Sequence, residues 1–236
     1  MQQGTLLHML SRMIERITFI TIGQTPRADL VPEIVSGLPS PVEVRELGAL
    51  DGLGAEEIAR LEPGIEDHAL ITRLHDGTQT VIGKRWVTGR IQEMLDRTAT
   101  VDDSRGWREA SVLLCTGDFS ALRSPGLFLD SQHLVDSGVD ALCHGADSVG
   151  LLVPLSRQEE EHHFRPRNGQ SMRTAHASPY RDDDFEAAGR TLADCDVIVM
   201  HCMGYTEAQR DAVSVGSGRP VLLARRMVAS ALAQLL

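Results

Sequence analysis

The stretches VLLCTG at residues 112–117 and VIVMHCMG at residues 197–204 share one form. Each is an apolar run of strand length that ends on a cysteine, with a glycine two residues later. Such a run is typical of a buried parallel strand, and its carboxyl end delivers a thiol and a bare backbone turn to one edge of a sheet. Ligands of open α/β sheets bind at that edge. One such strand in each half of the chain predicts that Cys115 and Cys202 face each other across a single cleft.

Strand and helix patterns alternate along the whole chain, which is the arrangement of α/β proteins with mainly parallel sheets. The length of 236 residues suffices for two small lobes with a real core. We expect an N-terminal extension over residues 1–15, a first lobe made of residues 16–117 and 205–236, and a second lobe made of residues 118–204. The cleft then lies between the two lobes.

The two halves repeat a plan, though not a sequence. A polar loop follows an early strand in each half, at residues 23–27 and 154–158, and a Cys-x-Gly stretch comes later in both. In the first loop, Thr25 followed by proline predicts a helix over residues 26–36 with Thr25 as its N-cap. The pair Asp76-Gly77 between two short strand patterns predicts a hairpin that decorates the first lobe.

Charge and composition exclude several classes of partner. The sequence has 23 Lys and Arg against 33 Asp and Glu, a formal net charge of −10, and only 4% aromatic residues. Nucleic-acid binding needs clustered cations, so we expect no nucleic-acid partner. No window approaches about 18 uninterrupted apolar residues, so we expect no membrane span. Residues 1–15 lack the small-residue cleavage pattern of a secretory signal, which predicts a cytoplasmic protein.

The cysteines suit reduced thiols better than a disulfide framework, because all four lie in or beside apolar runs. They are Cys115, Cys143, Cys195 and Cys202. The sequence contains no CxxC motif and no cluster of His and Cys ligands, and the glycine-rich stretch at residues 48–54 lacks a phosphate-binding pattern. We therefore expect neither a metal nor a cofactor.

Several short motifs accompany the two cysteine stretches in a fixed order. They are GQTPR at residues 23–27, GALDGL at 48–53, TRLHDG at 72–77, LLCTGDF at 113–119, VPL at 153–155, SPY at 178–180 and CMGYT at 202–206. With these motifs the chain resembles the AroM family from about Ile17 to its C-terminus. That family is similar in turn to the cofactor-independent Asp/Glu/hydantoin racemase superfamily. The resemblance implies two Rossmann-like (flavodoxin-like) lobes, one catalytic cysteine from each, and a carboxylate held between them.

The resemblance also implies roles for individual residues. Cys115 falls on the first catalytic cysteine of the superfamily and Cys202 on the second. The positions that fall on its substrate-binding loops and turns are Gln24, Thr25, Arg27, Thr116, Gly117, Met203, Gly204 and Thr206. The racemases usually follow their cysteines with Asn-Thr or Thr-His/Glu, whereas this chain has Thr-Gly and Met-Gly, and His201 stands where the AroM pattern has Asp. Substrate identity does not transfer across those differences.

Cofactor-free racemisation needs a base on one face of the α-carbon and an acid on the other. A thiolate and a thiol can fill these roles, and backbone N–H groups at helix N-termini favour the thiolate. Glycine and a helix start follow both Cys115 and Cys202, which supplies such donors. Thr116 and Thr206 add hydroxyl donors for a carboxylate, and Arg27 adds its charge partner.

Other interpretations of these residues stay open. An unpaired cysteine often only fills space, and packing is the favoured role of Cys143 and Cys195. Strand alternation turns His201 away from Cys202, which disfavours a direct catalytic role. Arg73 and His75 fit either a lid over the cleft or a solvated hairpin tip. The run EEEHH at residues 159–163 favours a solvated helix face over a metal site.

These patterns predict a racemase or epimerase-like enzyme acting on a small carboxylate, an amino acid or a derivative, through Cys115 and Cys202. Two alternatives remain. One is an isomerase or decarboxylase of a dicarboxylate in the same cleft, and the other is a protein that binds a carboxylate metabolite without catalysis. The oligomeric state is open, and a homodimer is compatible with the sequence.

Overall fold

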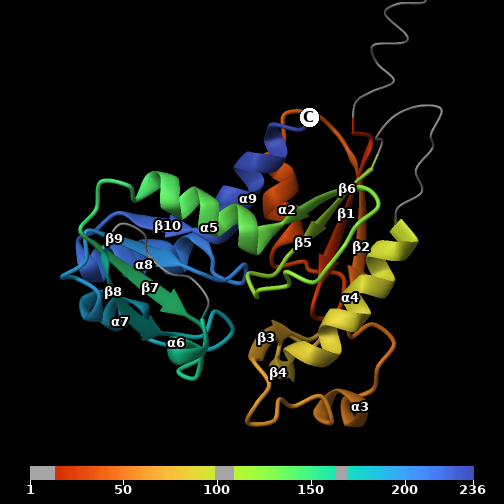
Figure 1. Ribbon diagram of the computed structural model, residues 1–236, viewed down its shortest axis with the longest axis horizontal. Coiled ribbons are helices and arrows are strands. Elements are labelled where there is room, and N and C mark those ends of the chain that lie inside the picture. The colour runs from red at the N-terminus through yellow and green to blue at the C-terminus, as the bar shows by residue number, and fades with distance from the viewer. Residues whose placement is uncertain (1–13, 99–108, 163–168) are drawn as a thin grey trace, which may run out of the picture.

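The computed structural model describes residues 14–98, 109–162 and 169–236, and it contains two four-stranded parallel sheets (Figure 1). The first sheet has the order β2-β1-β5-β6 and the second the order β10-β9-β7-β8. The strands of the first sheet are β1 (Arg16–Thr21), β2 (Glu43–Gly48), β5 (Glu109–Leu113) and β6 (Leu127–Asp130). Those of the second are β7 (Ser148–Val153), β8 (Ser171–His176), β9 (Val197–Met200) and β10 (Val221–Leu223). The expected α/β class with mainly parallel sheets is confirmed.

The two sheets have the same topology. Counted within its own half, each sheet places its strands in the order second, first, third, fourth. Cys115 follows the third strand of the first sheet, and Cys202 follows the third strand of the second. The repeated plan seen in the sequence is therefore a repeated arrangement of strands.

The division into sheets does not coincide with the expected lobe boundaries. The fourth strand of each half comes after the cysteine and joins the same sheet beside the third strand. Hence β6 lies in the first sheet, although residues 118–204 were expected in the second lobe. Likewise β10 lies in the second sheet, although residues 205–236 were expected in the first. We call the part around the first sheet the first lobe and the part around the second sheet the second lobe.

Side-chain alternation along the strands produces three cores. One face of each sheet packs into a core shared by the lobes, together with α2 (Val31–Ser36), α5 (Ser131–Leu142) and α9 (Ala224–Ala233), which gather where the lobes meet (Figure 1). The other face of the first sheet packs with α4 (Lys84–Thr98). The other face of the second sheet packs with α7 (Phe185–Thr191) and α8 (Glu207–Ser217).

This alternation decides where the thiols lie. Leu114 belongs to the shared core, whereas Cys115, one residue further, packs against the separate core of the first lobe. Cys202 packs in the same way against the separate core of the second lobe. The two thiols therefore occupy corresponding positions in the two halves.

The expected hairpin is present and consists of β3 (Ala69–Arg73) and β4 (Gln79–Gly83), which pair antiparallel. Gly77 in its turn has φ +87°, a conformation that favours glycine. The hairpin and α3 (Ala55–Ala59) extend from the first lobe, and the hairpin reaches toward α6 (Gln158–Glu161) of the second (Figure 1).

The first helix begins later than the sequence predicted. It starts at Val31, with a proline in its first turn, and not at residue 26. The reason is that Thr25 does not cap a helix: its amide and its hydroxyl both donate to the carboxylate of Asp51, at 2.8 and 2.7 Å. Among the helices in the described ranges, none combines the length and the apolar character needed to cross a bilayer.

Candidate active site

Both cysteines line one cavity of about 80 Å³ between the lobes. Its walls are the loops that follow β1, β5, β7, β8 and β9, closed on one side by the hairpin strand β3. Residues that line it from both lobes include Arg27, Cys115, Thr116, Tyr180, Cys202 and Gly204. A volume of this size holds several water molecules or one small organic molecule.

The two Cys-x-Gly stretches, which we call the cysteine turns, have the same hydrogen bond. The backbone N–H of Gly117 donates to Cys115 Sγ at 3.4 Å, and that of Gly204 donates to Cys202 Sγ at 3.4 Å. Both glycines allow neighbouring side chains to approach the turn closely. A Cβ on Gly117 would lie 2.9 Å from the side chain of Leu70 in the hairpin. Each sulfur therefore accepts one backbone N–H while it is still a thiol. The same N–H can stabilise the thiolate once the sulfur ionises.

Burial is the largest influence on both thiols. It raises the pKa of Cys115 to about 12 and raises the pKa of Cys202 as well, because a thiolate loses its hydration in the cavity. The glycine N–H groups and the cation of Arg27 oppose that rise in both cases. Both groups are neutral thiols at neutral pH in the ligand-free protein.

We expect iodoacetamide to alkylate Cys115 and Cys202 slowly at pH 8 and faster as the pH rises above 9. The thiolate is the nucleophile, and a raised pKa moves its formation to higher pH than the value of about 8.5 for a free thiol. Peptide mass spectrometry over a pH series measures the rate at each site. Labelling of both sites at pH 8 as fast as that of glutathione would contradict the burial argument.

Arg27 lines the cavity, but its charge is already paired. Its Nε and Nη2 donate to the two carboxylate oxygens of Asp29, both at 2.9 Å, and its Nη1 donates to Thr21 Oγ1 at 3.0 Å. Burial alone would lower the pKa of Arg27, but the bonds to Asp29 and Tyr180 outweigh it and the pKa is raised. The side chain is only 4% exposed. Arg27 is therefore a fixed, permanently charged wall of the cavity.

Tyr180 is a site residue that sequence reasoning missed. Its hydroxyl accepts from Arg27 Nη2 at 3.2 Å, so it connects the loop after β8 to the loop after β1. Burial raises the pKa of Tyr180 above its usual range, and the hydroxyl stays protonated and able to donate. Its presence in the SPY motif at residues 178–180 was the available signal.

Replacing Gly204 by alanine should destabilise the protein by about 1 to 3 kcal/mol, because the added methyl group overpacks the cavity wall where Gly204 meets Tyr180. The new Cβ would lie 2.5 Å from Tyr180 Oη, so the ring must leave its bond to Arg27. Denaturant unfolding measures the change. Gly89→Ala in α4 is the matched control, since its Cβ meets nothing within 4 Å and alanine favours a helix. Equal stability of the two variants would contradict the prediction.

The other expected contacts divide into two groups. Thr116, Gly117, Met203 and Gly204 line the cavity. The structure does not bring Gln24, Thr25 and Thr206 to it. Gln24 Oε1 accepts from the backbone N–H of His75, Thr25 bonds to Asp51, and Thr206 is the N-cap of α8. The physical reason is that short polar side chains after a strand also satisfy local backbone and turn groups.

The hairpin closes the cavity with its base, and not with the Arg73–His75 tip. Gln158 Nε2 donates to the carbonyl of Ala69 at 2.9 Å, and the carboxylate of Glu161 accepts from the N–H of Ala69 at 3.0 Å. Glu161 belongs to the acidic run expected on a solvated helix face, so this part of the run is instead an inter-lobe contact. His163 of that run lies outside the described residues. Within the described ranges, no group of three or more His, Cys, Asp or Glu side chains is arranged to hold a metal ion.

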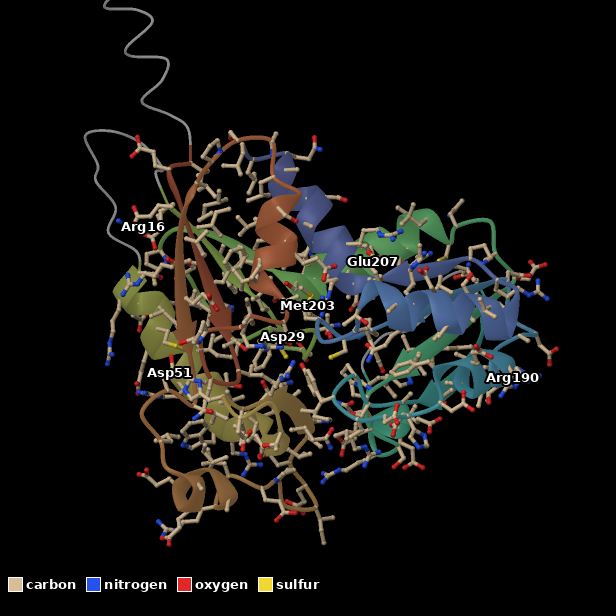
Figure 2. The ribbon with its side chains drawn as sticks, turned by 180° about the vertical axis from the view of Figure 1, so that it is seen from behind. Arg16, Asp29, Asp51, Arg190, Met203 and Glu207 are labelled. Atoms are coloured by element: carbon tan, nitrogen blue, oxygen red, sulfur yellow. The ribbon has the colours of Figure 1, made fainter. Side chains whose placement is uncertain are left out.

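Arg225 anchors the second cysteine turn by donating hydrogen bonds to its backbone carbonyls. This guanidinium is 1% exposed. Its Nε donates to the carbonyl of Met203 at 3.2 Å and its Nη2 to that of Gly204 at 2.9 Å, while Nη1 donates to the carbonyl of Asp29 at 3.2 Å. Figure 2 shows Met203 and Asp29 near each other at the junction of the lobes. No local pattern in the sequence marks Arg225 for this role.

The fold of two repeated α/β lobes is the Asp/Glu racemase-like fold. Solved structures with this fold include the aspartate racemase of Picrophilus torridus, which has a TM-score of 0.50 and 13% identity, over 93% of each chain. An unliganded arylmalonate decarboxylase has a TM-score of 0.52 and 15% identity, covering 93% of this chain and 92% of its own. The maleate isomerase of Pseudomonas putida S16 has a TM-score of 0.54 and 14% identity, covering 94% and 92%.

The model of the AroM protein family matches residues 17–236, and this chain belongs to that family. No curated protein matches the sequence. The resemblance drawn from the short motifs is therefore confirmed, together with the fold that it implied.

Proposed function

We propose that this protein is a cofactor-independent racemase or epimerase-like enzyme of the cytoplasm that acts on a small carboxylate by proton transfer between two cysteines. The observation that carries the proposal is the pair of cysteine turns at one cavity, each with a glycine N–H on its sulfur. Racemisation by proton transfer needs an acid and a base on opposite faces of the carbon, and the two lobes supply one thiol each.

The carboxylate group would bind between Arg27, Tyr180 and the N–H groups of the cysteine turns. Arg27, held in place by its pairing with Asp29, supplies a fixed guanidinium face, and the Tyr180 hydroxyl supplies a donor beside it. The apolar part of the substrate would face lining side chains such as Leu70 and Val153. This arrangement places charge at one end and leaves the reacting carbon near the sulfurs.

The charges around the thiols favour different roles for them. Arg27 favours the ionised form of both thiols, but Arg225 adds to this effect at Cys202, and a charge on Cys202 is itself a cause of the raised pKa of Cys115. We infer that Cys202 ionises first and Cys115 stays protonated. In one direction the Cys202 thiolate accepts the proton of the α-carbon, and the Cys115 thiol gives its proton to the other face. The reverse direction exchanges the two roles.

A neutral Cys115 thiol also supports a second candidate. With its pKa raised to about 12, Cys115 keeps a proton that it can deliver to the carbanion left by loss of carbon dioxide, or to the carbanion formed when a nucleophile adds to the double bond of an unsaturated dicarboxylate during its isomerisation. In these reactions one cysteine donates the proton or acts as nucleophile. The products, and not the site geometry, separate the two candidates.

The proposal is tested with D- and L-aspartate, D- and L-glutamate, phenylmalonate and maleate in deuterated solvent. Mass spectrometry and NMR follow deuterium at the α-carbon, and gas release and product identity follow decarboxylation or isomerisation. Deuterium incorporation with loss of chirality supports the racemase. Binding of one of these compounds without exchange or turnover would overturn catalysis and leave a carboxylate-binding protein.

A further inference from the structure

One hydrogen bond ties the two cysteine turns to each other across the cleft. Thr116 Oγ1 donates to the backbone carbonyl of His201 at 3.0 Å. Thr116 directly follows Cys115, and His201 directly precedes Cys202. Beside the other bonds between the lobes, the Thr116 side chain therefore joins them at a point one residue away from each thiol.

The acceptor end of this bond is held rigidly. The backbone N–H of His201 donates to the carbonyl of Leu152 at 3.0 Å, which continues the pairing of β7 and β9 past the end of β9. The His201 ring is 7% exposed, and its Nε2 lies 2.9 Å from Asp136 Oδ1 of α5. Asp136 in turn accepts from Gln132. The carbonyl that receives the Thr116 hydroxyl is thus fixed by a sheet on one side and by a helix on the other.

A threonine hydroxyl has one proton to donate. While that proton is given to His201, Thr116 does not donate to a carboxylate in the cavity, which was the role expected from the sequence. We propose that Thr116 is a positioning residue that fixes the separation of the Cys115 and Cys202 sulfurs. This inference deepens the proposed function and rests on it, because two thiols that act on one carbon must both reach it. An error of about 1 Å in such a placement costs about a hundredfold in rate.

The test measures the gap between the thiols without a substrate. Bis-methanethiosulfonate reagents of graded length link two cysteines only when their span matches the separation of the sulfurs, and peptide mass spectrometry detects the link between Cys115 and Cys202. We compare the wild type with Thr116→Val, which has the same shape without the hydroxyl, and with Thr116→Ser, which keeps the hydroxyl. Cys115→Ser is the control that cannot form the link.

The wild type and Thr116→Ser should share one preferred reagent length. Thr116→Val should lose that preference, with a yield of the preferred link lowered about tenfold or more, in line with the sensitivity of reacting groups to small displacements. Single-site labelling of each cysteine should stay the same in all three proteins. If Thr116→Val fails to fold, Thr116→Ala takes its place in the same comparison.

Identical length profiles in the wild type and the valine variant would overturn the inference, as would a wild type that no reagent links. If a substrate is found, a higher KM for Thr116→Val with unchanged kcat and an unchanged profile would assign Thr116 to ligand binding instead. Failure of the proposed function has a different signature, since the deuterium screen would then be negative while the crosslinking result stands.

Discussion

Serine in place of Cys115 or Cys202 should abolish the exchange of the substrate's α-proton with solvent. Positioned acid–base groups contribute about 10²- to 10⁴-fold to such rates, and a serine hydroxyl is too weak an acid to replace a thiol in either role. The smaller oxygen still fits beneath the N–H of Gly117 or Gly204, so the fold should be kept. Deuterium incorporation into the active compound of the screen measures the loss.

Cys143→Ala is the control for this experiment. Cys143 is 3% exposed, packs in the shared core and does not line the cavity. Its replacement can cost stability, but it should leave the exchange rate per folded molecule unchanged. Full exchange in both serine variants would reject the two-cysteine mechanism, and loss in only one of them would favour the single-cysteine reactions of the second candidate.

Replacing Arg225 by methionine should destabilise the protein by about 3 to 5 kcal/mol, because three backbone carbonyls lose their donor and each such loss costs about 1 to 3 kcal/mol. The methionine fills similar space but leaves the carbonyls of Met203, Gly204 and Asp29 without their donor. For a chain of this length, that change corresponds to a fall in Tm of roughly 6 to 20 °C. Urea unfolding and a thermal melt measure it.

Arg226→Met is the matched control, one residue further along α9. Arg226 is half exposed and pairs with Glu207 at the surface, so its loss should change the free energy of unfolding by only about 0.5 kcal/mol. If the two variants unfold at the same urea concentration, the buried guanidinium does not hold the second cysteine turn as described.

Features with a local physical cause could be predicted from the sequence. An apolar run with a terminal Cys-x-Gly specifies a buried strand and a tight turn within a few residues, and Asp76-Gly77 specifies its hairpin in the same way. Because carboxyl ends of parallel strands meet at one edge, the sequence alone predicts that the two thiols lie at a shared cleft.

Features that depend on distant contacts could not be predicted. The bond from Arg27 to Tyr180 joins residues 153 positions apart, and the bond from Arg225 to Asp29 joins residues 196 positions apart. The sheet that β6 and β10 join is likewise decided by pairing, and a short strand pattern does not reveal its neighbour. Thr25 illustrates a third limit, since the same residue type can cap a helix, bind a ligand or hold a turn.

The repeated strand order has a stereochemical consequence. Most binding sites present different groups to the two faces of a ligand and therefore distinguish between enantiomers. In this protein a tetrahedral carbon held between the sulfurs would meet the same motif in front and behind, so a molecule and its mirror image would be treated almost alike at the reacting centre. Among the described segments, the hairpin belongs to the first lobe alone and lines the cavity from one side, so discrimination between the remaining substituents would arise there.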